Sequence, residues 1–320
     1  MPEPLRHNWT ISEITEIYSR PVLELVYQAA TVHRQNHDPR AIQVSSLLSI
    51  KTGGCSEDCK YCSQSSHYET DIQVEPMMEV AEIVARAKSA KESGSGRFCL
   101  STAWRQIPHA EMDNILEIIR SVNELGLEVC ATMGMLSQSQ ARQLKEAGLH
   151  TYNHNLDTGK AYYEQIVTTR SYEDRLNTLQ NAQEAGLNIC SGGILGMGES
   201  LEDRLDLLKN LANLRRHPES VPINVLVPVE GTEIRKDPDF SFWDLLRTVA
   251  TARIMMPQSY VRLSAGRASL GEIEQAFCFF AGANSIFSGD KLLTTKNNEP
   301  DQDDRLFNIL GLYKSQYGHH

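Results

Sequence analysis

Residues 127–156 read LEVCATMGMLSQSQARQLKEAGLHTYNHNL, a stretch that holds a strand, a helix and a second strand in succession. The β-rich run Leu127–Thr132 predicts a strand, and the amphipathic run Ser137–Ala147 predicts a helix. Gly148 follows as a helix-ending residue, and His150–Leu156 predicts the next strand. Strands and helices that alternate in this way indicate a parallel sheet.

The same alternation extends from about Ala41 onward, without a long linker rich in Pro, Gly or Ser. Eight strand–helix repeats in one compact domain favour an α/β fold of the (β/α)8 TIM-barrel type over an open doubly wound sheet. The other strands are expected at Ile42–Ile50, Arg97–Thr102, Leu187–Gly192, Ile223–Val227, Tyr260–Ser264 and Asn284–Ile286. The other helices are expected at Met112–Leu125, Tyr172–Ala185, Leu201–Leu214, Phe242–Met256, Ile273–Phe280 and Asp304–Tyr313.

Three parts are expected along the chain. Residues 1–40 form an N-terminal helical extension, because apolar residues recur with helical spacing between Ile11 and Ala30. Residues 41–296 form the barrel domain, and residues 297–320 form a C-terminal helix and tail. In such barrels the chemistry lies at the carboxyl ends of the strands, so functional residues are expected there.

The composition excludes some classes of function. With 320 residues, of which 41% are hydrophobic, the chain can bury a large core. A formal net charge of -10 argues against a protein that binds nucleic acid or an anionic membrane by charge. The start, Met1–His7, lacks a signal-peptide pattern, and no apolar run approaches the roughly 20 residues that span a bilayer. We expect a soluble, cytoplasmic protein that acts on small molecules.

Three of the seven cysteines lie in one loop after the first predicted strand. Cys55, Cys59 and Cys62 have C-x3-C-x2-C spacing. Three thiolates leave one iron of a 4Fe-4S cluster open to another ligand, which suggests catalysis rather than electron storage. A structural zinc site is the alternative, because His67 could complete its four ligands.

This loop, with Tyr61 directly before its last cysteine, resembles the signature of the radical S-adenosylmethionine superfamily. The resemblance implies that the amino and carboxylate groups of S-adenosylmethionine bind the open iron, with Tyr61 among the cofactor-binding residues. It also implies that an electron from the cluster cleaves the sulfonium to give a 5′-deoxyadenosyl radical, which abstracts hydrogen from unactivated carbon. The protein's share is to orient the cofactor and to exclude water.

A second set of cysteines, Cys99, Cys130 and Cys190, lies on three different predicted strands. A single buried cysteine usually belongs to the core, as we expect for Cys278, but three on separate strands can face one another inside a barrel. The surrounding sequence resembles the biotin synthase family, which implies that the three hold a 2Fe-2S cluster with Arg262 as fourth ligand. Chemistry alone would assign Arg262 to an ion pair or an anionic substrate, because a guanidinium has no lone pair to donate.

Polar residues alternate at the end of the fourth predicted strand. Asn153, Asn155 and Asp157 share one face, because side chains alternate along a strand. Three polar groups in a barrel interior need partners, which favours ligand binding over a polar turn. The family resemblance implies that Asn155 and Asp157 contact the ribose of S-adenosylmethionine, and that Asn153 and Asn155 approach the substrate.

Further cofactor contacts are expected on three other elements. Glycines after the fifth strand allow a flat ring to approach the backbone, and the resemblance implies that Ile194 contacts the adenine. The planar fork of Arg175 suits the cofactor carboxylate, with a solvated arginine on a helix face as the alternative. The second strand ends without the Gly-Gly-Glu of many superfamily members, so we expect backbone carbonyls near Thr102 to bind the cofactor amino group.

The substrate-binding residues are expected to suit a molecule with a polar head and an acidic tail. Asn224 on the sixth strand can hydrogen-bond a ureido ring, while Lys51, Thr294 and Thr295 can hold a carboxylate. Each of these residues alone is weak evidence, since an exposed Lys or Thr usually belongs only to the surface.

The resemblance as a whole predicts a sulfurtransferase of the radical S-adenosylmethionine type. It implies insertion of sulfur between C6 and C9 of dethiobiotin to form biotin, with the 2Fe-2S cluster as sulfur donor. It also implies a homodimer and an electron donor such as flavodoxin or ferredoxin. The alternatives are a related maturase or mutase with a single cluster, and a non-catalytic zinc or iron-sulfur protein.

Overall fold

The computed structural model of the chain describes residues 5–289 and 291–315. The strands of its main sheet are β1 (Ala41–Lys51), β2 (Arg97–Thr102), β3 (Glu128–Thr132), β4 (Thr151–Asn153), β5 (Asn188–Cys190), β6 (Gly193–Leu195), β7 (Ser220–Val225), β8 (Tyr260–Leu263), β9 (Ser285–Phe287) and β12 (Tyr313–Ser315). All pairings in this sheet are parallel, and β9 pairs with both β8 and β1, so the sheet closes on itself. The expected (β/α)8 TIM-type barrel is confirmed.

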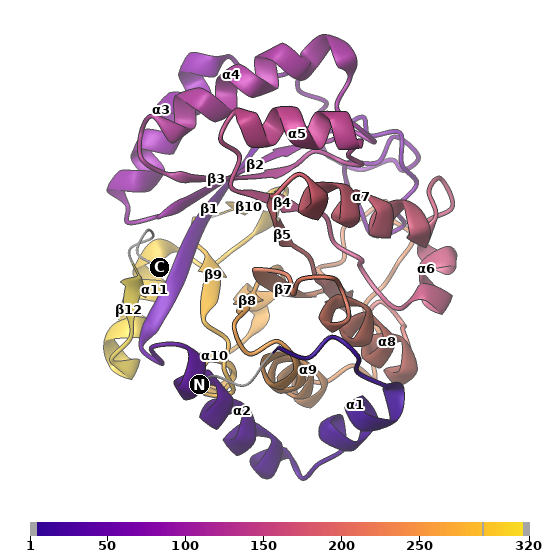
Figure 1. The fold of residues 1–320 in the computed structure, drawn as a ribbon, viewed down its shortest axis with the longest axis vertical. Coiled ribbons are helices and arrows are strands. Elements are labelled where there is room, and N and C mark those ends of the chain that lie inside the picture. Colours follow the sequence, from indigo (N-terminus) through magenta and orange to yellow (C-terminus); the bar gives the residue numbers. More distant parts are fainter. Residues whose placement is uncertain (1–4, 290, 316–320) are drawn as a thin grey trace.

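Helices form a ring around the barrel (Figure 1). They are α1 (Ile11–Tyr18), α2 (Val22–Asn36), α3 (Val80–Glu92), α4 (Met112–Asn123), α5 (Gln138–Glu146), α6 (Lys160–Ile166), α7 (Tyr172–Glu184), α8 (Leu201–Ala212), α9 (Phe242–Met255), α10 (Glu272–Phe280) and α11 (Pro300–Leu310), with 3-10 turns at His109–Glu111 and Arg267–Ser269. The N-terminal helices α1 and α2 pack outside the barrel against α8 and α9. Within the described ranges, no helix is both long enough and apolar enough to cross a bilayer.

Several helices begin where the sequence supplies a capping residue. The residues before α5, α7 and α8 are Ser137, Ser171 and Ser200. Each serine hydroxyl accepts a hydrogen bond from the backbone N–H three residues later, and the side chain at that later position accepts from the serine N–H. Such reciprocal caps satisfy N–H groups that a helix leaves unpaired, and each contributes about 1 kcal/mol.

The fifth barrel position differs from the single strand expected at Leu187–Gly192. It consists of two short pieces, β5 and β6, and both pair with β7. A Cβ added at Gly192 would lie 1.9 Å from the carbonyl oxygen of Pro222 on β7. The close approach of β7 therefore requires glycine at this position. Sequence reasoning had explained the glycines here by the approach of a bound ring.

The C-terminal segment also differs from the expectation. The helix expected at Asp304–Tyr313 begins at Pro300 and ends at Leu310, because Gly311 takes a left-handed φ of 66°. The chain then returns to the sheet, where β12 pairs with β1. A hairpin of β10 (Lys291–Leu292) and β11 (Thr295–Lys296) precedes the helix. The division of the chain at residues 40 and 296 stays a prediction.

Candidate active site at the carboxyl ends of the strands

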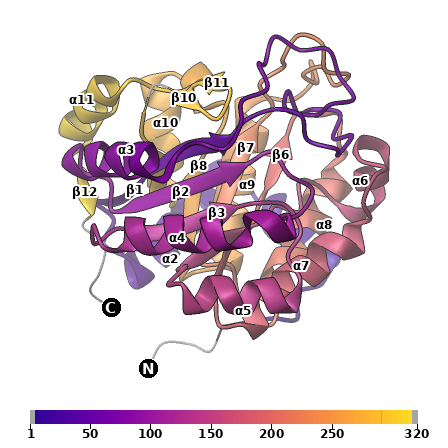
Figure 2. The same ribbon diagram turned by 90° about the horizontal axis from the view of Figure 1, so that it is seen from above.

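The loop cysteines lie beyond β1, where the chain folds back on itself. The N–H of Cys55 donates to the carbonyl of Gln64 at 2.9 Å, and the N–H of Cys62 donates to the carbonyl of Cys59 at 2.9 Å. Figure 2 shows this loop rising beyond the strands beside the loop that follows β7. Lys60 and Glu233 form an ion pair between the two loops at 3.3 Å.

Residues after α6 hold the part of the loop that lies between Cys55 and Cys59. The carboxylate of Asp58 accepts hydrogen bonds from the N–H groups of Thr168 and Thr169, at 2.9 and 3.1 Å. Burial alone would raise the pKa of Asp58, but the bonds from these two threonines outweigh it and lower the pKa to about 2. The carboxylate is therefore ionised at neutral pH and fixes the loop to the segment after α6.

The three loop thiols are placed too far apart to share one zinc ion. Burial, together with the neighbouring Cys59, raises the pKa of Cys62 to about 12, so an unaided thiol here stays protonated. A metal centre would supply the positive charge that ionises it. Zinc binds thiolates at about 2.3 Å, so its ligand atoms lie at most about 4.6 Å apart. In the described chain, no three cysteine sulfurs lie within 4.8 Å of one another.

The fourth zinc ligand of that alternative is also placed elsewhere. His67 is exposed, and its Nε2 lies 3.2 Å from the carbonyl oxygen of Ser56. Its ring is thus bonded to the backbone of the loop. Neither the spacing of the three sulfurs nor the position of His67 therefore suits a zinc site.

The second set of cysteines lies inside the barrel, as expected. Cys99 of β2 and Cys130 of β3 are direct partners in the strand register, and Asn153 of β4 is the partner of Cys190 of β5. All three thiols are buried. The hydrogen bond from Cys130, opposed by burial, and the charge of Arg262 lower the pKa of Cys99. The amide nitrogen of Asn153 donates to the sulfur of Cys190 at 3.1 Å.

Arg262 of β8 is buried in the same interior. Its Nε donates to Ser285 Oγ at 2.8 Å, and its Nη2 donates to Gln43 Oε1 at 3.0 Å. Its guanidinium also lies over the ring of Phe287, 4.4 Å from the ring centroid. Among the described residues, the hydrogen bonds of Arg262 are made by Nε and Nη2, and none is made by Nη1. One nitrogen of the group is therefore left for a ligand in the cavity.

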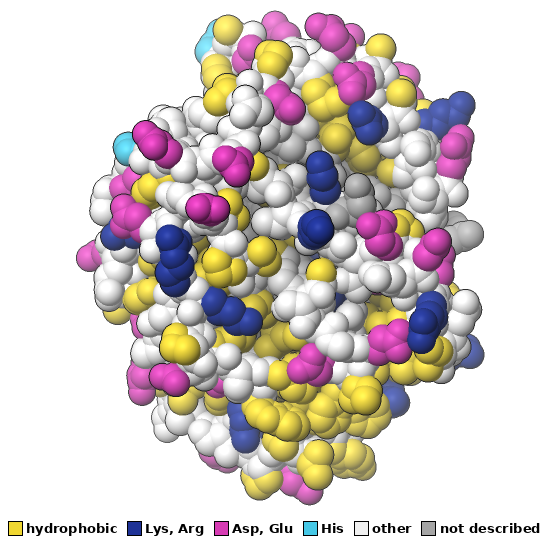
Figure 3. Space-filling model, turned by 180° about the vertical axis from the view of Figure 1, so that it is seen from behind, with side chains coloured by type: hydrophobic (Ala, Val, Ile, Leu, Met, Phe, Trp, Pro, Cys, Tyr) yellow, Lys and Arg dark blue, Asp and Glu magenta, His cyan; other side chains and the backbone are white. Residues whose placement is uncertain are grey.

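A cavity of about 240 Å³ is lined by cysteines of both sets, although Cys55, Cys59 and Cys190 are not in its wall. Cys62 contributes to its wall from the loop, and Cys99, Cys130 and Arg262 contribute from the barrel. The other expected site residues in its wall are Tyr61, Asn153, Asn155, Asp157, Ile194, Asn224, Thr294 and Thr295. Figure 3 shows the face opposite to that of Figure 1, where acidic and basic side chains are interspersed.

Asp157 is held by two side chains at the edge of the cavity. Tyr61 donates to its carboxylate at 2.5 Å, and Arg175 forms an ion pair with the same oxygen. Arg175 also donates to Tyr163 Oη at 2.8 Å and to the carbonyl of Asn155 at 2.6 Å. The solvated alternative for Arg175 was wrong, because its side chain is buried. In this structure its N–H groups bond other groups of the protein.

Three other expected residues have contacts of their own. Asn224 donates to the carbonyl of Gly193 at 2.9 Å and accepts from the N–H of Ala265 at 3.1 Å. Lys51 hydrogen-bonds the carbonyl of Gly53 and is not among the residues that line the cavity. Thr102 is buried at the end of β2 and is also outside the cavity wall. The remaining cysteine, Cys278, is buried in α10, as expected.

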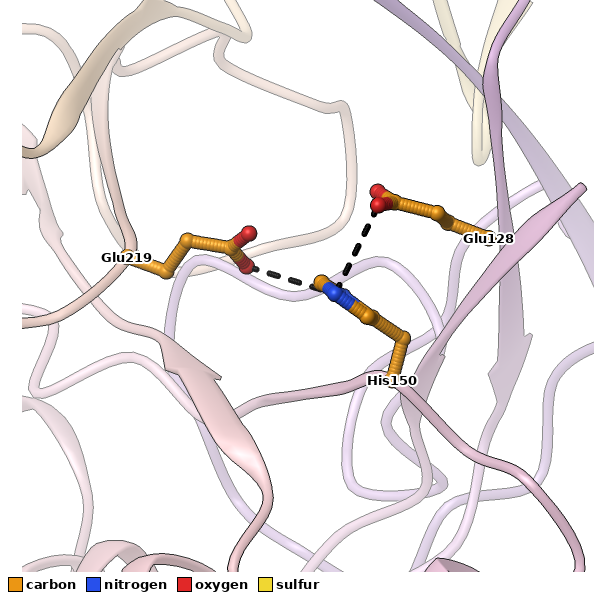
Figure 4. Close-up of side chains that lie close together, drawn as sticks. All are labelled: Glu128, His150 and Glu219. Atoms are coloured by element: carbon orange, nitrogen blue, oxygen red, sulfur yellow. Dashed lines mark ion pairs between the residues drawn. The ribbon is translucent and has the colours of Figure 1, made fainter. Parts of the chain in front are cut away.

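A separate group of ligand-type side chains lies at the amino ends of the strands. Glu128, His150 and Glu219 are, within the described chain, the one such group with ligand atoms inside 4.8 Å (Figure 4). Arg97 already pairs with both carboxylates, at 2.9 and 2.8 Å. Burial alone would raise the pKa of Glu219, but Arg97 holds it below its ordinary value. We interpret the group as an ion-pair cluster that closes the barrel floor.

Comparison with known proteins assigns the chain to a family whose features agree with the arrangement of this site. The Radical SAM superfamily model matches residues 49–211, and the model of the Biotin and Thiamin Synthesis associated domain matches residues 222–313. The chain is 53% identical to the biotin synthase of Cytophaga hutchinsonii over 313 residues, which cover 98% of this chain and 93% of that one. The chain belongs to the biotin synthase family.

Other comparisons extend this finding. The biotin synthase of Nostoc punctiforme is 55% identical over 313 residues, which cover 96% of this chain and 93% of the relative. A solved structure of methylornithine synthase matches with a TM-score of 0.80 at 19% identity, covering 96% of this chain and 94% of that one. The FeFe-hydrogenase maturase of Carboxydothermus hydrogenoformans matches with a TM-score of 0.82 at 18% identity, covering 96% and 76%. These two structures show the fold alone.

Sequence reasoning missed the residues that hold the loop of Cys55, Cys59 and Cys62. Thr168 and Thr169 bond Asp58, and the adjacent Arg170 donates to the sulfur of Cys59 at 3.4 Å. The only signal was a polar run between two helices, and its partners lie more than 100 residues earlier in the chain.

Proposed function

We propose that the chain forms biotin by radical insertion of sulfur between C6 and C9 of dethiobiotin. In this proposal Cys55, Cys59 and Cys62 hold a 4Fe-4S cluster that binds S-adenosylmethionine. Cys99, Cys130, Cys190 and Arg262 hold a 2Fe-2S cluster that donates the sulfur. The observation that supports the proposal most strongly is the single cavity whose wall includes cysteines of both sets.

The reaction is divided between the bound groups and the protein. A 4Fe-4S cluster held by Cys55, Cys59 and Cys62 would, with S-adenosylmethionine bound, supply radical chemistry able to break an unactivated C–H bond. The chain supplies two fixed sites in the wall of one cavity, so that a bound substrate can contact both the site of hydrogen abstraction and the sulfur source. The apolar walls Leu47, Phe287 and Leu292 exclude water from a radical that would otherwise react with other donors.

We assign the cofactor contacts to residues around Asp157. Asp157 and Asn155 bind the ribose, Tyr61 and Ile194 lie against the adenosine, and Thr102 lies near the amino group. Tyr61 already donates to Asp157, so ribose binding would exchange one hydrogen-bond partner of that carboxylate for another. Arg175 binds the cofactor carboxylate in this proposal, which requires it to release one of its present contacts.

We assign the substrate contacts to the remaining polar residues of the cavity. Asn153, Asn155 and Asn224 face the ureido ring, and Thr294 and Thr295 on the β10–β11 hairpin face the carboxylate. Lys51 joins them if its side chain leaves the carbonyl of Gly53 when substrate binds. A reductant of the flavodoxin or ferredoxin type, a homodimer and a cytoplasmic location complete the proposal.

An anaerobic single-turnover assay tests the proposal. The reconstituted chain is mixed with dethiobiotin, S-adenosylmethionine and a chemical reductant, and biotin is measured by mass spectrometry. We expect biotin from the parent chain and from Cys278→Ala, because Cys278 is buried in α10 and does not line the cavity. Absence of biotin from a chain that carries both clusters would overturn the proposal.

A further inference from the structure

One cationic side chain in the described structure touches a sulfur of the loop cysteines. Arg170 follows the two threonines that hold Asp58, and its Nη2 donates to the sulfur of Cys59 at 3.4 Å. The Arg170 side chain is only 8% exposed, so water screens this contact weakly. Among the described residues, the sulfurs of Cys55 and Cys62 accept no such bond from a side chain.

The position of Arg170 is fixed by charges around it. Glu57, which lies between the first two loop cysteines, is buried and has an oxygen 3.7 Å from Arg170 Nε. Arg105 pairs with the other carboxylate oxygen of Glu57 at 3.0 Å. Two guanidinium groups thus share one carboxylate, and of the two only Arg170 reaches the Cys59 sulfur.

Arg175, the neighbouring arginine, does not take this position. Its donors are directed to Tyr163, Asn155 and Asp157, away from the loop sulfurs. Arg175 therefore acts on the Cys59 thiol by its charge at a distance, whereas Arg170 is the arginine that is bonded to the sulfur.

We infer that Arg170 is a positioning residue for electron transfer, which raises the reduction potential of the 4Fe-4S cluster through its bond to the Cys59 sulfur. This inference rests on the proposed function, because it takes the loop cysteines as cluster ligands. Reduction adds one negative charge to a group already bound by three thiolates. A guanidinium bonded to one ligand sulfur stabilises the reduced form more than the oxidised form. An arginine is charged at every working pH, so the effect is constant.

Redox titration monitored by EPR, without S-adenosylmethionine, tests this inference apart from cofactor binding and activity. Removal of a charge-assisted hydrogen bond in Arg170→Met should lower the ratio of reduced to oxidised cluster about tenfold at a fixed potential. For a one-electron couple this is a shift of about 59 mV to lower potential. Arg170→Lys keeps the charge and should retain most of the parent potential.

Arg105→Met is the matched control. It removes a guanidinium from Glu57 but none from a cysteine sulfur, so its shift should be clearly smaller than that of Arg170→Met. Equal potentials for the parent and Arg170→Met, or equal shifts for Arg170→Met and Arg105→Met, would overturn the inference.

Two further outcomes separate this inference from the proposed function. A parent chain that forms no 4Fe-4S cluster would overturn the proposed function and this inference with it. If Arg170→Met loses the cluster, Arg170→Lys and Arg170→Gln decide, because both side chains keep a hydrogen-bond donor. Loss of the cluster from all three would show a purely structural contact and overturn the redox role.

Discussion

Cys62 of the outer set and Cys99 and Cys130 of the inner set line the same cavity, but the two sets are positioned by different structural means. The inner set lies on β2, β3 and β5, where hydrogen-bonded strand register fixes each sulfur. The outer set lies in a loop, which is held by backbone N–H groups of Thr168 and Thr169 and by the side chain of Arg170. A rigid sheet therefore positions the proposed sulfur source, and a braced loop positions the cluster that starts the radical. The outer set should be more sensitive to changes in distant side chains.

The largest expected effect is a different response of two reaction products to substitutions in the two sets of cysteines. Cys59→Ala should abolish both 5′-deoxyadenosine and biotin, because it removes a ligand of the proposed cluster that binds S-adenosylmethionine. Cys99→Ala should reduce biotin more than about 100-fold and leave 5′-deoxyadenosine formation intact, because it removes only an inner ligand. Both products can be measured by chromatography in one anaerobic reaction. Equal loss of both products in the two variants would contradict separate roles.

The next largest effect concerns the barrel floor beneath the inner set. Arg97 is fully buried on β2, two residues before Cys99, and pairs with Glu128 and Glu219. Arg97→Met should lower the free energy of unfolding by about 3–5 kcal/mol, because it leaves two carboxylates without their counter-charge. Denaturant unfolding measures this change.

A surface arginine provides the control for that variant. Arg86 pairs with Glu82 at 3.4 Å in an exposed position on α3. Arg86→Met should change the free energy of unfolding by less than about 1 kcal/mol. A similar small change for Arg97→Met would show that the floor cluster does not support the inner set.

Sequence reasoning succeeded where local pattern decides the structure. The alternation of strands and helices predicted the barrel, and β2 has the bounds that were expected. The inner cysteines were assigned to the interior because they fall on three separate predicted strands and because the sequence around them resembles the biotin synthase family. In contrast, α3 begins without a side-chain cap, α6 has only seven residues, and β12 depends on pairing with the distant β1. Patterns this short or this weak could not predict them.

The same division applies to the site. The cysteine motif identified the loop, but the contacts from Thr168, Thr169 and Arg170 join segments more than 100 residues apart. Arg175 was expected to face a cofactor, yet its ion pair with Asp157 could not be read from spacing. Such contacts depend on how two loops meet after the barrel has formed.

A smaller effect tests the contacts of Thr168 and Thr169 with Asp58 directly. Asp58→Ala removes the acceptor that Thr168 and Thr169 share, and should weaken iron binding by the outer set about 10–100-fold. Iron-chelator competition, with the outer cluster followed by EPR, measures this. Asp71→Ala is the control, because Asp71 is exposed and near the loop in sequence. The inner set should be unaffected in both variants, and equal loss from the two sets would contradict the comparison.

The smallest expected effect concerns the pH dependence of stability, through a histidine that lies away from both sets of cysteines. Burial, with the charges of Arg253 and His37, lowers the pKa of His33 on α2 from 6.5 to about 3. Below pH 6.5 His33 therefore binds a proton in the unfolded chain but stays neutral in the folded chain. The free energy of unfolding falls as the pH decreases toward 3. From pH 7.5 to 5.5 this costs about 1 kcal/mol.

Thermal unfolding at the two pH values checks this expectation. His33→Leu should lose less stability than the parent on acidification, whereas His67→Gln should behave like the parent because His67 is exposed. An unchanged pH dependence in His33→Leu would show that His33 titrates alike in the folded and unfolded chain.

The central claim is that the two sets of cysteines are two separate metal sites around one cavity. Mössbauer spectra of the anaerobically reconstituted parent, Cys59→Ala and Cys99→Ala test it most directly. We predict both 4Fe-4S and 2Fe-2S signals in the parent, loss of only the 4Fe-4S signal in Cys59→Ala, and loss of only the 2Fe-2S signal in Cys99→Ala. A parent with a single type of cluster, or a Cys99→Ala spectrum identical to that of the parent, would contradict the claim.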